Sequence, residues 1–150
     1  MFLDHSSKTF EAGKTLAKFL KVGDIIVLEG DLGVGKTLFS QGIVKGLGFQ
    51  DNITSPTFAL MNEYQIFETK IYHIDAYRIK FQEEVYDLGL EDIYLEDAII
   101  LIEWADNLGT YKPKDYLKIT LEYKCDGREL KMEDVGRSSI LKRGNLSCLF

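Results

Sequence analysis

The sequence predicts an α/β domain whose central sheet is mostly parallel, flanked by helices and extended by antiparallel strands. Residues 25–28 and 98–103 are apolar runs, the second ending in an acid, and such runs are typical of parallel strands buried on both faces. Residues 58–75 and 116–135 each contain two strand-like stretches around a short turn, which predicts antiparallel hairpins. The chain of 150 residues has the length of one domain, and we predict a single domain over residues 1–150.

The elements of the first half follow from hydrophobic periodicity and from its interruption by glycine and proline. Apolar residues recur with helical spacing after Thr9, which is a suitable N-cap because its hydroxyl can accept from first-turn amides. Pro56 excludes a regular central strand from the hydroxyl-rich stretch around it. The predicted elements are a helix at residues 9–21, a strand at 25–28, a helix at 38–45 and strands at 58–64 and 70–75.

The second half begins with an acidic segment, residues 83–97, whose apolar positions predict two short helices broken at Gly89. A buried strand follows at residues 98–103. Alternation by twos on both sides of a turn at residues 125–127 predicts the second hairpin. Its strands are expected at residues 116–123 and 128–135, and residues 136–150 are expected to form a loose C-terminal tail, with a short helix at most.

The segment from Gly30 to Thr37 reads Gly-Asp-Leu-Gly-Val-Gly-Lys-Thr and fits the phosphate-loop pattern G-x-x-x-x-G-K-[ST] at every fixed position. A predicted buried strand precedes it and a predicted helix follows it, which is the context that the motif requires. Backbone N–H groups of the glycine loop and the helix N-terminus would bind phosphate oxygens. Lys36 would reach the β- and γ-phosphates, and the Thr37 hydroxyl would ligate Mg²⁺. The predicted nucleotide-binding residues of this stretch are Gly30, Asp31, Leu32, Gly33, Val34, Gly35, Lys36, Thr37 and Leu38.

A phosphate-loop protein needs a second acid, at the end of a neighbouring buried strand, to complete its Mg²⁺ site. Glu103 fits this role best because its strand is predicted to be buried and the acid lies at the carboxyl-terminal edge, where ligands bind. Asp75, at the end of residues 70–75, is the alternative, and both could serve, one on the metal and one on the attacking water. His73 alternates with Asp75 along the same strand, so it could pair with that acid, bind metal, or simply pack in the sheet.

Two further features concern the base and the γ-phosphate. Residues 123–126, Tyr-Lys-Cys-Asp, approach the guanine-reading pattern, but Tyr123 replaces its asparagine and the segment is a predicted turn, which favours ATP over GTP. Thr57 follows the predicted phosphate-loop helix at the place of a switch segment, where its hydroxyl could sense the γ-phosphate or Mg²⁺. The alternative is an ordinary hydroxyl-rich loop around Pro56.

Composition excludes several classes of protein. The net charge of −6 argues against binding nucleic acid through a broad basic face. No apolar stretch reaches the 18 residues of a membrane span, and residues 1–5 lack the basic and apolar regions of a secretory signal. We therefore expect no membrane association.

Four stretches resemble the TsaE (YjeE) family in their order and spacing: residues 30–37, 55–58, 73–78 and 103–104. The phosphate loop alone is generic, whereas Ser-Pro-Thr-Phe, His-x-Asp-x-Tyr-Arg and Glu-Trp together are specific, and the resemblance spans about residues 6–135. It implies a cytoplasmic, Mg²⁺-dependent ATPase needed for threonylcarbamoyladenosine modification of tRNA. It also implies TsaD and TsaB as protein partners, tRNA contacted only through their complex, and ATP hydrolysis that resets the complex between cycles.

The resemblance also implies roles for single residues. Thr37 and Glu103 match the family's Mg²⁺ ligands, Asp75 its His-x-Asp-x-Tyr-Arg acid, and Thr57 its switch threonine. With Lys36, the predicted catalytic set is thus Lys36, Thr57, Asp75 and Glu103. Ser6, Gly127 and Arg128 are looser matches near the nucleotide, and Arg128 would be a cation beside base or phosphate. Ala105 departs from the pattern, because many relatives have proline there.

Two other functions are compatible with a phosphate loop. A small-molecule kinase would need an arginine-rich lid, and residues 104–150 offer no clear one. A nucleotide-gated binding module would use ATP only to switch its affinity for a partner. Trp104 would serve such a partner as an anchor, or would be a core residue that fixes the strand before it.

Overall fold

The computed structural model describes residues 1–56, 59–144 and 146. The strands of this part of the chain are β1 (Phe2–Leu3), β2 (Ile25–Glu29), β3 (Met61–Ile66), β4 (Thr69–Asp75), β5 (Ala98–Glu103), β6 (Tyr116–Lys124) and β7 (Gly127–Val135). They form one seven-stranded sheet in the order β1-β7-β6-β2-β5-β4-β3. The predicted α/β fold with a mostly parallel centre and antiparallel additions is confirmed.

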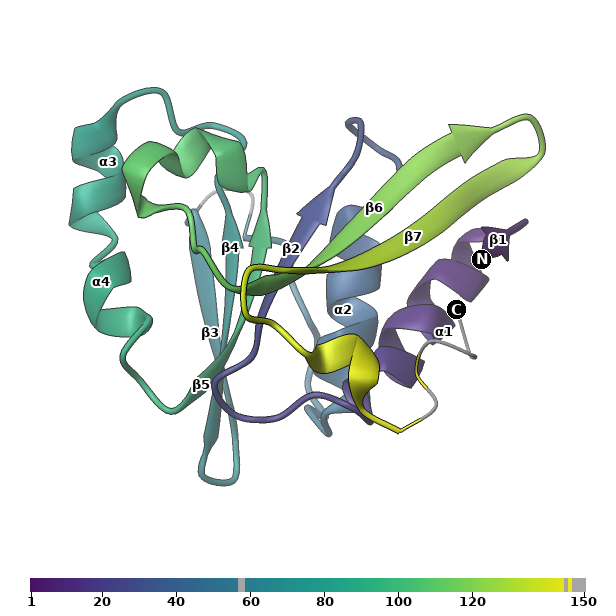
Figure 1. Cartoon of the computed structure of the whole chain (residues 1–150), viewed down its shortest axis with the longest axis horizontal. Helices are drawn as coiled ribbons and strands as arrows, with labels where there is room; N and C mark the ends of the chain where they lie inside the picture. The colour runs from purple at the N-terminus through teal and green to yellow at the C-terminus, as the bar shows by residue number, and fades with distance from the viewer. Residues whose placement is uncertain (57–58, 145, 147–150) are drawn as a thin grey trace.

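Helices cover both faces of this sheet (Figure 1). They are α1 (Ser6–Ala17), α2 (Lys36–Gly46), α3 (Gln82–Asp87), α4 (Leu90–Ile93) and two 3₁₀ helices, η1 (Ala105–Tyr111) and η2 (Ile140–Lys142). One apolar cluster joins α1, α2 and η2 to the sheet, and a second joins α3, α4 and η1 to its opposite face. The β-strand side chains alternate between the two clusters, as the period of two requires.

The parallel centre of the sheet determines where the functional residues lie. β2 pairs in parallel with β5 and β6, and β4 pairs in parallel with β5. Because parallel strands end at the same edge, Gly30, Asp75 and Glu103 meet there, and Asp75 is the register partner of Glu103. The apolar strand runs at residues 25–28 and 98–103 therefore position the predicted site.

Both predicted hairpins are present, with small shifts at their ends. β3 and β4 pair antiparallel, and β6 and β7 pair antiparallel with Lys124 opposite Gly127 across a two-residue turn. The two-residue strand β1 was not predicted, and it pairs with β7 at the sheet edge. Two residues are too short to show any alternation, so only the pairing with β7 makes them a strand.

The start of α1 differs from the prediction. The helix begins at Ser6, after an extended His5 whose Nδ1 accepts from the Ser7 amide at 3.2 Å, so Thr9 is not the N-cap. Thr9 lies within the helix and is fully buried. The prediction placed the cap at Thr9 because threonine is a common N-cap residue, but Thr9 instead faces the phosphate loop, where its methyl lies beside Gly35.

Helices α1 and α2 pack with their backbones in direct contact. A Cβ atom at Gly13 would lie 2.2 Å from the Phe39 carbonyl oxygen, and one at Gly42 would lie 2.2 Å from that of Phe10. Only glycine permits this approach. The close contact fixes α2, and with it the loop that α2 follows, against the rest of the domain.

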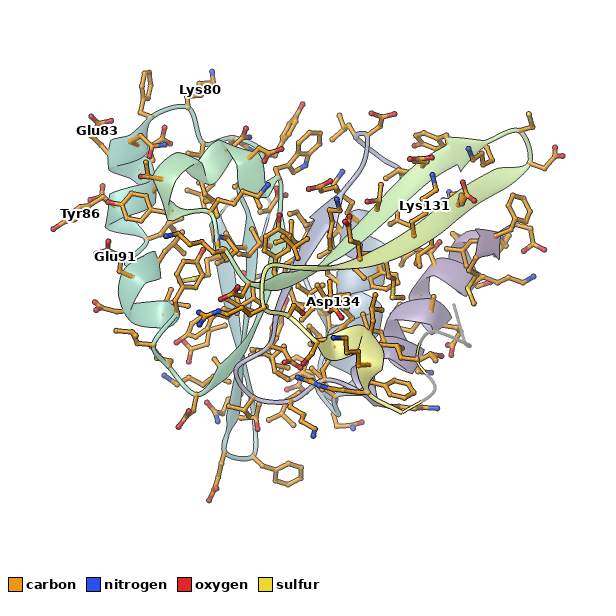
Figure 2. The ribbon with its side chains drawn as sticks, viewed as in Figure 1. Lys80, Glu83, Tyr86, Glu91, Lys131 and Asp134 are labelled. Atoms are coloured by element: carbon orange, nitrogen blue, oxygen red, sulfur yellow. The ribbon has the colours of Figure 1, made fainter. Side chains whose placement is uncertain are left out.

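The acidic segment forms the outer side of the sheet's second face. Gly89, with φ of +65°, separates α3 from α4 as predicted. Glu83, Tyr86 and Glu91 point away from the sheet (Figure 2). No helix in the described ranges is both long and apolar enough to cross a membrane.

The C-terminal segment is packed where the structure describes it, in contrast to the predicted loose tail. The Asp134 carboxylate accepts from the Ser138 hydroxyl at 2.7 Å and from the Ile140 amide at 3.0 Å. Ile140 and Leu146 are buried against the α1 side of the core. The hydrophobic pattern of this segment is too weak to predict that Ile140 and Leu146 are buried, because they pack against residues far away in the sequence. Residues 145 and 147–150 lie outside the described residues.

Candidate functional site

A cleft of about 550 Å³ opens at the carboxyl edge of the parallel strands, which is a suitable size for a nucleotide. Ten predicted site residues line it: Ser6, Leu32, Gly33, Gly35, Lys36, Thr37, Leu38, Asp75, Glu103 and Arg128. Four others do not, namely Gly30, Asp31, Val34 and Gly127. Thr57 lies outside the described residues. The tertiary structure thus brings most of the predicted set together from five separate parts of the chain.

The four predicted residues outside the cleft support the residues that line it. Val34 is fully buried in the core, and Gly30 is the close contact between the loop and β6, since a Cβ there would lie 2.2 Å from the Leu121 carbonyl oxygen. Gly127 likewise packs against the backbone of Leu3. Asp31 is exposed, and its carbonyl accepts from Lys36.

The phosphate loop is open toward the cleft because its glycines adopt conformations that other residues rarely reach. Gly35, with φ of +117°, is the N-cap of α2, and Gly33 has φ of +79°. The first-turn amides of α2 follow directly and face the cleft with the positive end of the helix. A loop of this kind is a cradle for phosphate oxygens.

Lys36 is folded back onto its own loop. Its Nζ donates to the carbonyl oxygens of Gly30 at 2.7 Å and Asp31 at 2.8 Å, and lies 4.2 Å from the centre of the Trp104 ring. Burial lowers the pKa of Lys36 from its usual value, while the negative charges of Glu103, Asp75 and Asp31 oppose that shift. Lys36 is therefore a buried cation held by weak acceptors that phosphate oxygens could replace.

Glu103 is buried and is held at both carboxylate oxygens. Oε2 accepts from the Thr37 hydroxyl at 3.0 Å. Oε1 lies 2.8 Å from Nε2 of His73 and 3.5 Å from the Ser40 hydroxyl. Both α2 residues reach down to the end of β5, so the carboxylate joins the phosphate-loop helix to the sheet.

Asp75 lies beside Glu103 but has a different environment. It is half-buried at the mouth of the cleft, and its Oδ1 accepts from the Tyr77 amide at 3.1 Å. Burial raises the pKa of Asp75, the Tyr77 hydrogen bond opposes the rise, and the nearby charge of Glu103 adds to it. Within the described residues His73 pairs with Glu103 rather than with Asp75, which resolves one alternative left open by the sequence.

The tip of the β6–β7 hairpin closes one side of the cleft. The Tyr123 hydroxyl donates to the Leu32 carbonyl at 3.4 Å. Arg128 lines the cleft, and its Nε is buried without a hydrogen-bond partner in the part of the chain that the structure describes. A buried guanidinium nitrogen without an acceptor, beside a phosphate loop, fits an anionic ligand.

The donor set also fits Mg²⁺. A threonine hydroxyl and a carboxylate 3.0 Å apart are hard oxygen ligands at the loop where phosphate oxygens would complete the coordination. Mg²⁺ is usually bound by one or two such protein groups together with substrate phosphates and water. Thr37 and Glu103 are the residues that would hold it.

Four cleft residues were not in the predicted set: Gln41, Tyr77, Arg78 and Trp104. Tyr77 and Arg78 belong to the His-x-Asp-x-Tyr-Arg stretch and Trp104 follows Glu103, so their motifs were visible. Gln41 carries no such signal, and lies one helical turn after Thr37. His73 and Ser40 were missed as partners of Glu103 because only the tertiary structure brings them to it.

Comparison with known proteins gives a consistent result. The family model described as "Threonylcarbamoyl adenosine biosynthesis protein TsaE" matches residues 3–130. The chain is 41% identical over 133 residues to a tRNA threonylcarbamoyladenosine biosynthesis protein TsaE of a Nostoc species, covering 85% of this chain and 80% of the relative. It is 46% identical over 129 residues to a protein of the same description from Rickettsia prowazekii, covering 85% of this chain and 89% of the relative.

A solved structure agrees with these sequence matches. The crystal structure of YdiB from Bacillus subtilis superimposes with a TM-score of 0.71 at 34% identity, covering 88% of this chain and 82% of YdiB. The similarity therefore includes the hairpins and helices as well as the phosphate loop, which alone is shared by many unrelated functions. The chain belongs to the TsaE family of threonylcarbamoyl adenosine biosynthesis proteins.

Proposed function

We propose that the protein is a Mg²⁺-dependent ATPase that acts in threonylcarbamoyladenosine modification of tRNA, in the cytoplasm, together with TsaD and TsaB subunits. The observation that supports the activity best is the single cleft in which the phosphate loop, the Thr37 hydroxyl and the buried Glu103 carboxylate meet. Family membership supports the place of this activity in tRNA modification.

Five side chains of the cleft have distinct roles in this mechanism. Lys36 exchanges the carbonyls of Gly30 and Asp31 for oxygens of the β- and γ-phosphates, which are stronger acceptors because they are charged. Arg128 offers its unpaired Nε to the nucleotide. When bound by Thr37 and Glu103, Mg²⁺ would neutralise the charge that develops on the phosphates. Asp75, at the cleft mouth beside Glu103, orients the attacking water.

We expect hydrolysis by the isolated protein to be weak. Lys36 Nζ already donates to carbonyl oxygens of its own loop. In addition, phosphate-loop proteins often receive an arginine or an ordering contact from a partner. Of the arginines after residue 104, only Arg128 lines the cleft, whereas Arg137 and Arg143 pair with acids at the opposite edge of the sheet. The described residues after position 104 thus include no arginine-rich lid, which favours an ATPase over a small-molecule kinase.

We propose that tRNA is contacted only through the partners. The chain carries a net charge of −6, and acidic side chains of α3 and α4 point outward (Figure 2). Such a surface repels the phosphate backbone of RNA, while it is compatible with a basic protein surface.

The test is phosphate release from ATP and from GTP in the presence of Mg²⁺, for the protein alone and with purified TsaB and TsaD. We expect ATP to be preferred and the partners to stimulate hydrolysis. Lys36→Ala should reduce the stimulated rate by at least roughly 100-fold, because it removes a cation that acts on the developing charge. A circular-dichroism spectrum of the variant controls for folding.

Three other results would contradict this proposal in different ways. A rate that the partners leave unchanged would remove the partner-dependent mechanism. Phosphate that appears on a small-molecule acceptor would indicate a kinase. ATP that changes the affinity for TsaB and TsaD without being hydrolysed would indicate a nucleotide-gated binding module.

A further inference from the structure

A histidine lies fully buried beneath the nucleotide cleft. His73 is on β4, one strand away from Glu103 on β5, and its side chain has no exposed surface, while that of Glu103 is 2% exposed. The two side chains meet at 2.8 Å through Nε2 and Oε1. His73 does not line the cleft itself, so a direct role toward the nucleotide is excluded by position.

The contact restricts the orientation of the Glu103 carboxylate. Thr37 donates to Oε2 from the helix side, and His73 contacts Oε1 from the sheet side. A carboxylate held at only one oxygen can rotate about its terminal bond, whereas one held at both oxygens presents a fixed edge. The orientation of the acid that we assign to Mg²⁺ therefore depends on a residue of the neighbouring strand.

The other ring nitrogen shows why histidine, and not an apolar residue, occupies this position. Nδ1 of His73 is buried and has no hydrogen-bond partner among the residues described. An unpaired buried nitrogen destabilises the fold, whereas an apolar side chain would pack between the strands without that cost. In the described part of the chain, the hydrogen bond to Glu103 is the polar contact that compensates for the burial of this ring.

We propose that His73 is a positioning residue, which holds the Glu103 carboxylate so that Oε2 stays beside the Thr37 hydroxyl as the second oxygen ligand for Mg²⁺. The inference rests on the proposed function, since it takes Glu103 as the metal acid. Partners that orient a metal ligand in this way typically contribute roughly 10- to 100-fold to metal affinity or activity.

The first test uses the unmodified protein without nucleotide. Because a carboxylate only accepts, Nε2 must carry a hydrogen. The chain has two histidines, and the exposed His5 is readily distinguished from the buried His73 in a ¹⁵N nuclear magnetic resonance spectrum. A protected Nε2–H is expected for His73, and its signal should move in Glu103→Ala. The Nδ1–H tautomer would overturn the proposal.

The second test compares substitutions at this position. In His73→Gln the amide nitrogen extends about as far as Nε2 and can still donate to Glu103, whereas His73→Leu fills the space without a donor. Ile71→Val is the matched control, because Ile71 is buried on the same face of β4 and does not line the cleft. ATP binding with a chelator present, the Mg²⁺ concentration for half-maximal turnover, kcat and the thermal midpoint are measured for each.

We expect His73→Leu to bind ATP normally without Mg²⁺ but to need roughly 10- to 100-fold more Mg²⁺ for half-maximal turnover. His73→Gln should restore the Mg²⁺ requirement to within a few-fold of the unmodified protein, as a merely structural role would not. Equal Mg²⁺ requirements in His73→Leu and Ile71→Val would overturn the inference. Failure of the proposed function would appear differently, as absent Mg²⁺-dependent turnover in the unmodified protein.

Discussion

Two buried side chains of opposite charge organise the cleft, Lys36 from the start of α2 and Glu103 from the end of β5. Neither pairs directly with the other among the contacts described: Lys36 donates to loop carbonyls, and Glu103 accepts from Thr37, Ser40 and His73. The two charges thus lie near the cleft without a short ion pair between them. Both stay available to a ligand that carries phosphate and metal.

Glu103→Ala tests the role of the acid. We expect the variant to bind ATP, because the glycine loop and Lys36 remain, but to lose Mg²⁺-dependent turnover by at least roughly 100-fold. Calorimetric titration with ATP and a phosphate-release assay measure the two effects separately, and a thermal melt controls for the donors left unpaired. Unchanged turnover would remove Glu103 from the metal site and leave Asp75 as the alternative.

Trp104 provides a direct signal for movement of Lys36. It is the only tryptophan of the chain, its ring lies 4.2 Å from Lys36 Nζ and 4.9 Å from the Tyr77 ring, and its φ of +59° is unusual for a bulky residue. Because Lys36 must leave its carbonyl partners to reach phosphate, ATP binding should change the fluorescence of Trp104.

The control for this change is Lys36→Ala, in which ATP should alter the emission far less. An emission that saturating ATP leaves unchanged in the unmodified protein would mean that Lys36 stays on its own loop. The cation–π contact also shows that Trp104 is more than a core residue that fixes β5.

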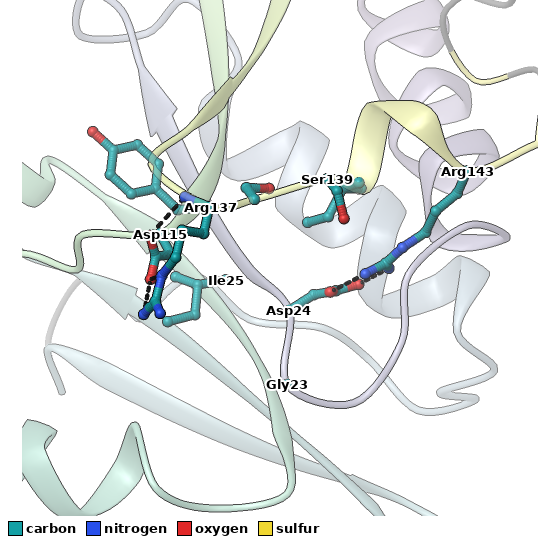
Figure 3. Close-up of a pocket in the computed structure, with 10 residues that line it drawn as sticks. Gly23, Asp24, Ile25, Asp115, Arg137, Ser139 and Arg143 are labelled. Carbon is teal, nitrogen blue, oxygen red and sulfur yellow. Dashed lines mark hydrogen bonds and ion pairs between the residues drawn. The ribbon is translucent and has the colours of Figure 1, made fainter.

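At the scale of elements, the segment after β7 binds the amino ends of the parallel strands. A pocket of about 360 Å³ lies there, bounded by two arginine–aspartate pairs (Figure 3). Arg143 contacts Asp24 at 2.5 and 2.8 Å, just before β2, and Arg137 contacts Asp115 at 2.9 and 3.2 Å, just before β6. The two pairs have similar geometry but different burial.

This difference in burial predicts different effects on stability. The Asp24 side chain is 8% exposed and that of Arg143 is 27% exposed, whereas Arg137 is 91% exposed. Arg143→Ala should lower the free energy of unfolding by about 1.5 to 3 kcal/mol, because a buried carboxylate loses charged donors. Arg137→Ala should lower it by less than about 1 kcal/mol, because water replaces the lost contact.

Urea unfolding of the two variants beside the unmodified protein measures this difference. Equal losses of unfolding free energy in the two variants would show that burial does not determine how much each pair contributes to stability. A small loss of unfolding free energy in Arg143→Ala would show that this contact of the C-terminal segment contributes little to holding β2, despite the buried Ile140 and Leu146.

At the scale of the whole molecule, the carboxyl and amino edges of the parallel strands have different roles. The carboxyl edge carries the glycine loop, the acids and the cleft, together with Trp104 and its positive φ. The amino edge carries the paired arginines and the C-terminal segment. The contacts at the amino edge stabilise the fold. The carboxyl edge can therefore contain groups that lack a hydrogen-bond partner, such as Nε of Arg128.

The surface acids predict how stability depends on pH. Five of them have a pKa below their ordinary values, 4.5 for glutamate and 3.8 for aspartate, because lysine or arginine partners donate to them: Asp4, Glu96, Glu122, Glu129 and Asp115. The unfolded chain then binds more protons than the folded one, so this contribution is complete above the ordinary values and is lost as the pH falls through the lower ones. Asp75 has the opposite sign, since burial raises its pKa.

We therefore expect the free energy of unfolding to fall below about pH 4.5, and to fall less steeply in about 1 M salt, which screens these exposed pairs. Urea unfolding at several pH values and two salt concentrations measures it. A stability that rises toward acid pH would mean that Asp75 and other buried acids outweigh the surface pairs.

The sequence by itself determined the class of fold and the phosphate-loop motif at its centre. The phosphate loop is read from consecutive residues, and the strands on which Glu103 and Asp75 end are read from local apolar periodicity, so no distant contact is needed to find them. The start of α1 was missed because Thr9 is a good cap by type, while its burial depends on α2 and the loop.

Only the tertiary structure decided which side chains meet. His73 and Ser40 reach Glu103, and Arg143 reaches Asp24, across separations in the sequence that no local pattern records. The same is true of β1 and of the C-terminal segment, which are too short or too weakly patterned to fold by propensity and are held by what they pack against. Local patterns determine which elements form, whereas packing of the elements determines the partners of each charge.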